Sequence, residues 1–191
     1  MKSIQLLVVG ALAMLCACQP SQKSNLYTVT GELEDSAHHG KKVYIMRYDD
    51  NKYIDSTFIE GNKFVFKGEV DTASFCRIDV SRDAFANFIL EGGDVKVDLK
   101  TYVYPSGTLQ NDEMSRIAKE EADLYAEVDR KMEDIKKQYE GDDAKVNEAT
   151  KKLEEEINAT LRKRCKELYA HHNDDAVGFY LAYSVFFNAL D

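Results

Sequence analysis

The sequence predicts an α+β protein in which an antiparallel β-sandwich or open barrel of about seven strands precedes a helical hairpin and a terminal apolar helix. Three observations lead to this fold class. Short runs of β-branched and aromatic residues, separated by turn residues, fill positions 27–99. Apolar residues recur at helical spacing through 111–168, and from 177 onward they point in nearly all directions. At 191 residues and 44% hydrophobic, the chain is large enough to bury a core.

The N-terminal residues predict export. Lys2 is followed by an apolar run of about 12 residues, which is shorter than the roughly 20 needed to cross a bilayer and therefore indicates a secretory signal. The run ends in Leu15-Cys16-Ala17-Cys18, which resembles the lipobox of bacterial lipoproteins. We expect the thiol of Cys18 to carry the lipid and to hold the chain on a lipid bilayer in the bacterial cell envelope, at the outer membrane or facing the periplasm. An ordinary signal peptide with incidental cysteines is the alternative.

These patterns divide the chain into four parts. Residues 1–17 are the expected lipoprotein signal peptide, 18–26 a polar tether, 27–105 the β-sandwich domain and 106–191 the helical segment. Of the 25 basic residues only Lys2 lies in the leader, so the mature part has a formal net charge of -10 against its 34 acidic residues. Because nucleic acid would be repelled by such a charge, a nucleic-acid partner is not expected.

The predicted strands in the first part are short and joined by tight turns. They are expected at 27–33, 42–48, 53–60, 63–70, 74–81, 87–91 and 94–99. Gly61-Asn62 predicts a type II′ hairpin between the third and fourth strands. One face of this hairpin carries Ile59, Phe64 and Phe66, and the other carries Ile54, Phe58 and Val65, so it needs cover on two sides.

A second hairpin is expected around Gly92-Gly93. There Leu90 and Phe88 would face Val95 and Val97, while Ile89 would lie on a mostly polar face. This hairpin, unlike the first, needs cover on one side only.

The helical segment predicts two long helices, near 111–139 and 142–168, that turn at Gly141-Asp142. Their apolar stripes are expected to pack on each other and on the sheet, and thereby to cover the second face of the first hairpin. A last helix, at 174–190, is apolar all round and must be wrapped by the domain or covered by a partner. The residues expected to form the possible partner surface are Val177, Phe179, Tyr183, Phe186 and Phe187.

No catalytic, metal or cofactor site is expected. Cys76 and Cys165 both lie inward by pattern; a disulfide between them is possible, but two separate buried thiols are favoured. The chain has no Cys-x-x-Cys motif. The adjacent pairs His38-His39 and His171-His172 point in different directions and do not chelate easily. Asp49-Asp50-Asn51 lacks the glycine and the glutamate of a calcium loop and is expected to be a solvated turn.

Several stretches together are similar to one domain family. They are Asp55-Ser56 with Phe64 to Gly68, Phe88 to Val95, Gly107-Thr108-Leu109-Gln110-Asn111-Asp112, and His172 to Gly178. They resemble the uncharacterised β-rich N-terminal domain of envelope lipoproteins of the thioredoxin-like, AhpC/TSA type. The resemblance implies that a thioredoxin fold with a Trp-Cys-x-x-Cys motif accompanies the domain, and no position up to Asp191 matches that motif.

The resulting functional expectation is a lipid-anchored, non-catalytic domain that holds or orients a thioredoxin-like domain or protein. The alternative is a stand-alone surface lipoprotein that binds a glycan or a peptide through exposed aromatic side chains. Its binding residues would be Tyr44, Tyr48, Tyr53 and Tyr102, although aromatic residues in strands more often serve packing.

Overall fold

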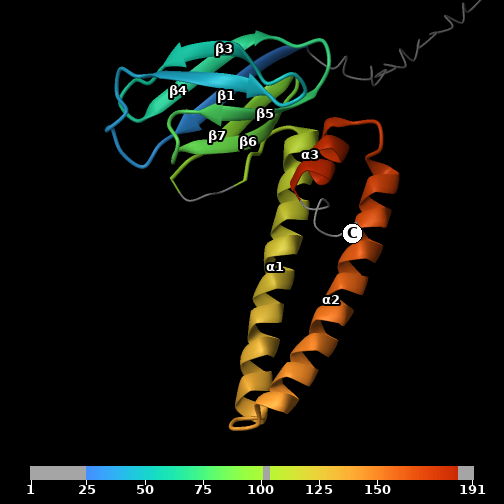
Figure 1. Cartoon of the computed structure of the whole chain (residues 1–191). Coiled ribbons are helices and arrows are strands. Elements are labelled where there is room, and N and C mark those ends of the chain that lie inside the picture. The colour runs from blue at the N-terminus through green and yellow to red at the C-terminus, as the bar shows by residue number, and fades with distance from the viewer. Residues whose placement is uncertain (1–24, 101–103, 185–191) are drawn as a thin grey trace, which may run out of the picture.

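The computed structural model describes residues 25–100 and 104–184, and it confirms an α+β fold with mostly antiparallel strands in two sheets, followed by helices (Figure 1). The strands are β1 Leu26–Glu32, β2 Lys42–Arg47, β3 Lys52–Phe58, β4 Lys63–Glu69, β5 Ser74–Asp79, β6 Phe85–Leu90 and β7 Gly93–Asp98. The helices are α1 Leu109–Gln138, α2 Asp143–His171 and α3 Ala176–Ser184. None of these helices combines the length and the apolar character needed to cross a bilayer.

The strands form a sandwich of two sheets, with the orders β4-β1-β7 and β3-β2-β5-β6. All pairs are antiparallel except β1 with β7, which is parallel and departs from the purely antiparallel prediction. Between the sheets lies the first core, which includes Val29, Val43, Ile45, Phe66, Cys76, Ile78, Phe88 and Val95. The inward position predicted for Cys76, and the shared apolar faces predicted for Phe64 with Phe66 and for Phe88 with Val95, are therefore confirmed.

The first predicted hairpin is wrong in its pairing. Gly61 has φ +64°, as a type II′ turn requires, and Glu60 bridges Lys63, but β3 pairs with β2 and β4 pairs with β1. The chain thus passes from one sheet to the other at this turn. The reason is that Ile59 and Phe64 both turn into the space between the sheets, where each is buried.

The outer face of that turn region does not receive the expected cover. Phe58 is 57% exposed and Val65 45% exposed, and Ile54 is also exposed. The helices pack instead on β5 and β6, at the opposite side of the four-stranded sheet. The prediction that the helical hairpin covers Ile54, Phe58 and Val65 is therefore wrong.

The second predicted hairpin fails in the same way, since β6 pairs with β5 and β7 pairs with β1. Leu90, Phe88, Val95 and Val97 all face the first core as expected. Ile89 was predicted on a polar face but is fully buried, because the helices cover the outer side of β6 at this position.

The two long helices form an arm that projects from the sandwich (Figure 1). At its tip Gly141 takes φ +83°, and the Asp142 side chain caps α2 by accepting a hydrogen bond from the Lys145 backbone N–H at 3.2 Å, as predicted. At its base, α3 lies between α1 and α2. A second core joins all three helices to β5 and β6; its members are Phe75, Ile89, Met114, Ile117, Cys165, Leu168, Ala176, Val177, Tyr180 and Leu181.

The described part of the last helix is wrapped by the domain itself. α3 covers only nine of the residues predicted as helix, and Val177 is fully buried in the second core. Val177 is therefore not part of a partner surface, because β5 and the two long helices already cover it. Phe179 is 41% exposed, whereas the side chain of Tyr183 and residues Phe186 and Phe187 lie outside the described residues.

Candidate functional site

Residues from three of the stretches singled out in the sequence meet where the sandwich joins the arm. They come from the end of β6 (89–91), the start of α1 (108–113) and the turn from α2 into α3 (172–178). We call this cluster the joint. Its contacts are polar and centred on the buried side chains of Glu91 and Asn111, and they connect the end of β6 and the start of α1 to the turn between α2 and α3.

Asn111 forms the centre of the joint and is fully buried. Its Oδ1 accepts a hydrogen bond from the Ile89 backbone N–H at 2.9 Å, and its Nδ2 donates to the Ile89 carbonyl at 2.7 Å. Nδ2 also donates to Thr108 Oγ1 at 2.7 Å. Because β6 is an edge strand, its outward backbone groups have no strand partner, and the Asn111 amide takes the place of one.

Glu91 and Gln110 extend the joint to the last helix. One carboxylate oxygen of Glu91 accepts from the Gln110 backbone N–H at 2.9 Å, and the other accepts from Gln110 Nε2 at 3.2 Å. Gln110 Oε1 in turn accepts from the backbone N–H of Ala176 at 3.0 Å. The first turn of α3 is thereby tied to the first turn of α1 and to the end of β6.

His172 fixes the turn between α2 and α3. Its Nδ1 lies 2.9 Å from Asp175 Oδ2 and its Nε2 lies 3.3 Å from Glu113 Oε1. Asp175 Oδ1 accepts from the Gly178 backbone N–H at 3.0 Å. Hydrogen bonds from Arg116, and secondarily from His172, hold the pKa of Glu113 below its usual value. These hydrogen bonds make the cluster a clamp between α1, the end of α2 and the first turn of α3. Within the described ranges, no group of three or more His, Cys, Asp or Glu side chains could hold a metal ion.

Cys76 and Cys165 are free and buried, and they belong to different cores. The alternative of two separate thiols describes this structure, and the possible disulfide is not formed. Burial raises the pKa of Cys76 to about 12 and that of Cys165 above its ordinary value. Both thiols are therefore protonated and unreactive at neutral pH.

The raised pKa of Cys76 predicts a loss of stability at high pH. In the unfolded chain this thiol ionises near 9.0, whereas in the folded chain it holds its proton to about 12. Its contribution to the free energy of unfolding is thus complete below pH 9 and falls between pH 9 and 12, by up to about 1.4 kcal/mol per pH unit. Denaturant titrations at several pH values should show that the free energy of unfolding declines less steeply between pH 9 and 12 in Cys76→Ala than in the wild type. If the free energy of unfolding falls equally steeply with pH in both proteins, this loss of stability does not come from Cys76.

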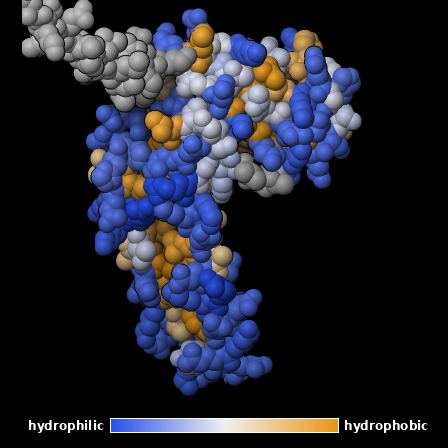
Figure 2. Space-filling model, turned by 180° about the vertical axis from the view of Figure 1, so that it is seen from behind, coloured by the Kyte–Doolittle hydropathy of each residue, from blue (hydrophilic) through white to orange (hydrophobic). Residues whose placement is uncertain are grey.

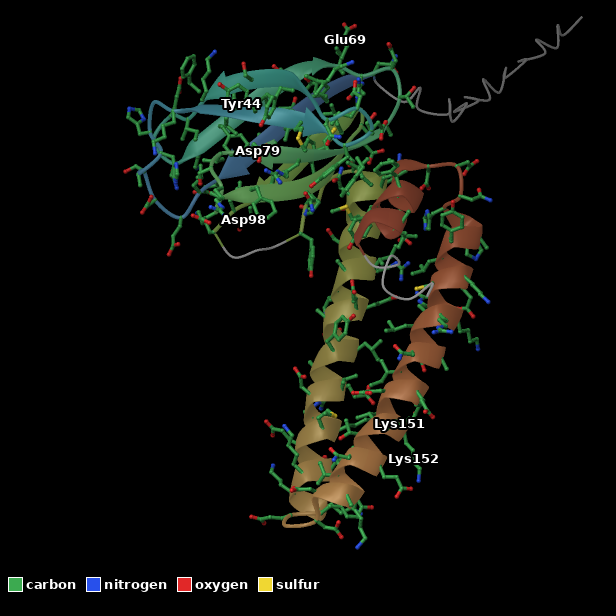
Figure 3. The ribbon with its side chains drawn as sticks, in the orientation of Figure 1. Tyr44, Glu69, Asp79, Asp98, Lys151 and Lys152 are labelled. Atoms are coloured by element: carbon green, nitrogen blue, oxygen red, sulfur yellow. The ribbon has the colours of Figure 1, made fainter. Side chains whose placement is uncertain are left out.

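A group of aromatic side chains lies on the outer face of the four-stranded sheet, away from the arm. We call it the aromatic face and define it by Tyr44, Tyr53 and Phe85. The rings of Tyr44 and Tyr53 are 5.1 Å apart, and the Tyr53 hydroxyl donates to Asp79 Oδ2 at 3.3 Å. The Arg77 guanidinium lies 4.8 Å from the centre of the Phe85 ring. Tyr44 and Asp79 are directly opposite each other on β2 and β5 (Figure 3).

A cavity of about 550 Å³ adjoins this face. Phe85 and Asn87 line it from β6, Lys100 and Tyr104 from the segment that follows β7, and Met114 and Tyr180 from the helices. Tyr53 and Phe85 are exposed, so the aromatic face and this cavity together form an open surface with ring faces and polar groups.

The remaining candidate residues are accounted for by local contacts or lie elsewhere. Tyr48 stacks on Phe75 at 4.7 Å and donates to Asn87 Oδ1 at 2.9 Å, so it serves packing. The carboxylate of Asp50 pairs with Arg47 and Lys52, which holds its pKa well below the usual range. Cys18 and Tyr102 lie outside the described residues.

The comparisons with known proteins bear on the first half of the chain. Residues 27–114 match the family model of a domain of unknown function (DUF4369). The matched region spans the sandwich and ends in the first turns of α1, so it includes Glu91 and Asn111 of the joint. It supports the expectation of an uncharacterised β-rich domain, whereas the association with thioredoxin-like lipoproteins stays a prediction. No curated protein and no solved structure gives a significant match to the chain.

Proposed function

We propose that this chain is a lipid-anchored, non-catalytic domain of the bacterial cell envelope that positions a thioredoxin-like domain or protein. The joint is the observation that carries the proposal. It holds the sandwich, the arm and α3 together through hydrogen bonds centred on the buried Asn111 and the partly buried Gln110. Such a clamp suits a module whose task is to keep two bodies at a set orientation, because fixed orientation needs a rigid connection.

The proposed partner contact lies on the exposed side of α3. Phe179 projects beside Phe75, with the two ring centres 6.0 Å apart, and remains 41% exposed at the corner between the sandwich and the arm. A large apolar side chain that a rigid neighbour holds in place is a typical interface anchor. The thioredoxin-like partner itself is inferred from the sequence resemblance.

The anchor is tested by metabolic labelling with a radioactive fatty acid in bacterial cells that express the full chain. We expect Cys18→Ser to abolish the label and to move the protein from the membrane to the soluble fraction. Cys16→Ser is the matched control and should keep both the label and the membrane location. Equal labelling of Cys18→Ser and the wild type would exclude Cys18 as the anchor.

The partner contact is tested by binding of a thioredoxin-like envelope protein encoded in the same genome, measured by calorimetry. Phe179→Asp should weaken binding by about 30-fold or more, since it places a charge in an apolar contact. The control Tyr169→Asp adds the same charge on α2, where Tyr169 is 49% exposed. The same loss in both variants, or no binding by the wild type, would count against the positioning role.

The aromatic face favours a second candidate function, the binding of a glycan. Exposed rings stack on the apolar faces of sugars, and neighbouring Asp79 and Arg77 offer hydrogen bonds to hydroxyl groups. A glycan-array signal lost in Tyr53→Ala but kept in Phe179→Asp would favour this candidate over the first.

A further inference from the structure

A chain of ion pairs lies at the base of the arm, beside the stripe of hydrophobic residues that Figure 2 shows along the arm between hydrophilic ones. Within α1, Arg116 pairs with both Glu113 and Glu120. Glu120 also pairs with Arg164 of α2, with 2.6 Å between its Oε2 and Nη2 of the arginine. The chain ends at His172, which contacts Glu113. Among these side chains, imidazole is the type that changes its charge between pH 5 and 8.

Both ring nitrogens of His172 face a carboxylate. Nδ1 lies 2.9 Å from Asp175 Oδ2, and Nε2 lies 3.3 Å from Glu113 Oε1. Because contacts with Arg116 and His172 lower the pKa of Glu113, this carboxylate is ionised at neutral pH and can only accept a hydrogen bond. An imidazolium ring donates from both nitrogens, whereas a neutral ring donates from one and turns a lone pair toward the other carboxylate. Both contacts are therefore satisfied only when the ring carries a positive charge.

The surroundings of the ring bear on this charge as well. His172 is the C-cap of α2, and the C-terminal end of a helix favours a positive charge. Its side chain is 16% exposed, so water screens the two carboxylates only in part. Arg116 is the cation that opposes a charged ring, and Glu120 offsets it from the other side. His171 and Asp174, close by in the sequence, are exposed and act on the ring mainly through water.

We propose that the proton on His172 regulates how firmly α3 is held to α1. With the proton in place, Nε2 donates to Glu113 and links the turn before α3 to α1. Without it, the neutral ring keeps the shorter contact, from Nδ1 to Asp175, and the link to Glu113 is lost. Asp175 also accepts from the Gly178 backbone N–H, so the change reaches the first turn of α3. The clamp is therefore closed at mildly acidic pH and loosens as the pH rises from about 5 to about 8.

The clamp is tested by hydrogen exchange of the α3 backbone amides in the full chain, purified in detergent. The measured rates, divided by those of unstructured amides at the same pH, show how often α3 opens. We expect the opening to increase about tenfold between pH 5.5 and 8 in the wild type, since a charge-assisted hydrogen bond is lost. His172→Gln should open equally at both pH values, and the exposed control His171→Gln should keep the tenfold change. A wild type that opens equally at both pH values would overturn the proposal, as would a tenfold change that persists in His172→Gln.

Two further measurements keep His172 in place, in case His172→Gln opens α3 at every pH. In a nuclear magnetic resonance titration of the wild type, the Gly178 amide signal should move with the same pH midpoint as the ring Cε1–H signal of His172. Separate midpoints would mean that the ring does not act on α3. Glu113→Gln gives the ring an amide, which accepts from a charged ring and donates to a neutral one, so the opening of α3 should no longer depend on pH. A tenfold change in this variant would show that Glu113 does not carry the link.

The consequence for the partner contact rests on the proposed function. Phe179 lies one turn after Asp175 in α3, so a loosened α3 holds Phe179 less firmly. Calorimetry with the thioredoxin-like envelope protein should show binding about tenfold weaker at pH 8 than at pH 5.5 in the wild type, and equal at both in His172→Gln. Binding of equal strength at both pH values in the wild type would overturn the regulation and support the positioning role. No binding at either pH, with the tenfold change in α3 opening retained, would overturn the positioning role and support the clamp.

Discussion

Replacing Asn111 by Leu is expected to lower the free energy of unfolding by about 3 to 5 kcal/mol. The substitution keeps a similar side-chain shape but removes both hydrogen bonds to Ile89, whose N–H and carbonyl then lie buried without a partner. Each unsatisfied buried group costs roughly 1 to 3 kcal/mol. The loss of the contact to Thr108 adds to this cost. The effect is large because a single side chain completes the hydrogen bonding of an edge strand at the base of the arm.

Denaturant unfolding measures this effect, and two further variants identify its cause. Asn111→Asp keeps an acceptor for the Ile89 N–H but loses the donor to its carbonyl, and it buries a carboxyl group, so it should also destabilise the fold. Asn158→Leu, on the exposed side of α2, should change stability by less than about 0.5 kcal/mol. If Asn111→Leu unfolds like Asn158→Leu, Asn111 does not hold the edge of β6.

The sequence predicted where the strands lie and which side chains face inward, but it failed to predict which strands pair. The turn at Gly61 and the alternation of side chains around it determine that Ile59 and Phe64 both point inward. The same local pattern is compatible with a hairpin in one sheet and with a crossing between two sheets. The choice depends on β1, which pairs with β4 on one side and β7 on the other, and such long-range competition leaves no local signal.

The joint could not be predicted from local sequence patterns either. Asn111 lies three residues before Met114 and six before Ile117, so it begins the buried stripe of α1. A polar residue at the start of a helix ordinarily indicates an N-cap. The sequence alone therefore did not predict that Asn111 is buried. What decides its role is the free edge of β6, and the sequence gives no sign that this edge faces α1. Resemblance pointed to the right residues without showing what they do.

Replacing Gly178 by Ala is expected to lower the free energy of unfolding by about 3 kcal/mol. A Cβ at this position would lie 1.7 Å from the His172 carbonyl oxygen, which is a backbone atom and has little freedom to move. α3 must then shift away from the end of α2, and the hydrogen bonds of His172 with Asp175 and Glu113 are strained or lost. The second core, in which Val177 is fully buried, opens with it.

The direction of the stability change in Gly178→Ala distinguishes a steric clash from an effect of helix propensity. In an open helix, Gly to Ala stabilises by about 1 kcal/mol, because alanine has the higher helix propensity. The matched variant Ala182→Gly lies in the same helix at an exposed position and should cost only about that amount. Thermal unfolding should therefore rank Gly178→Ala below Ala182→Gly, the reverse of the order that propensity predicts. The opposite ranking would mean that α3 does not approach the His172 backbone this closely, and the clamp between α2 and α3 would then be looser than its hydrogen bonds indicate.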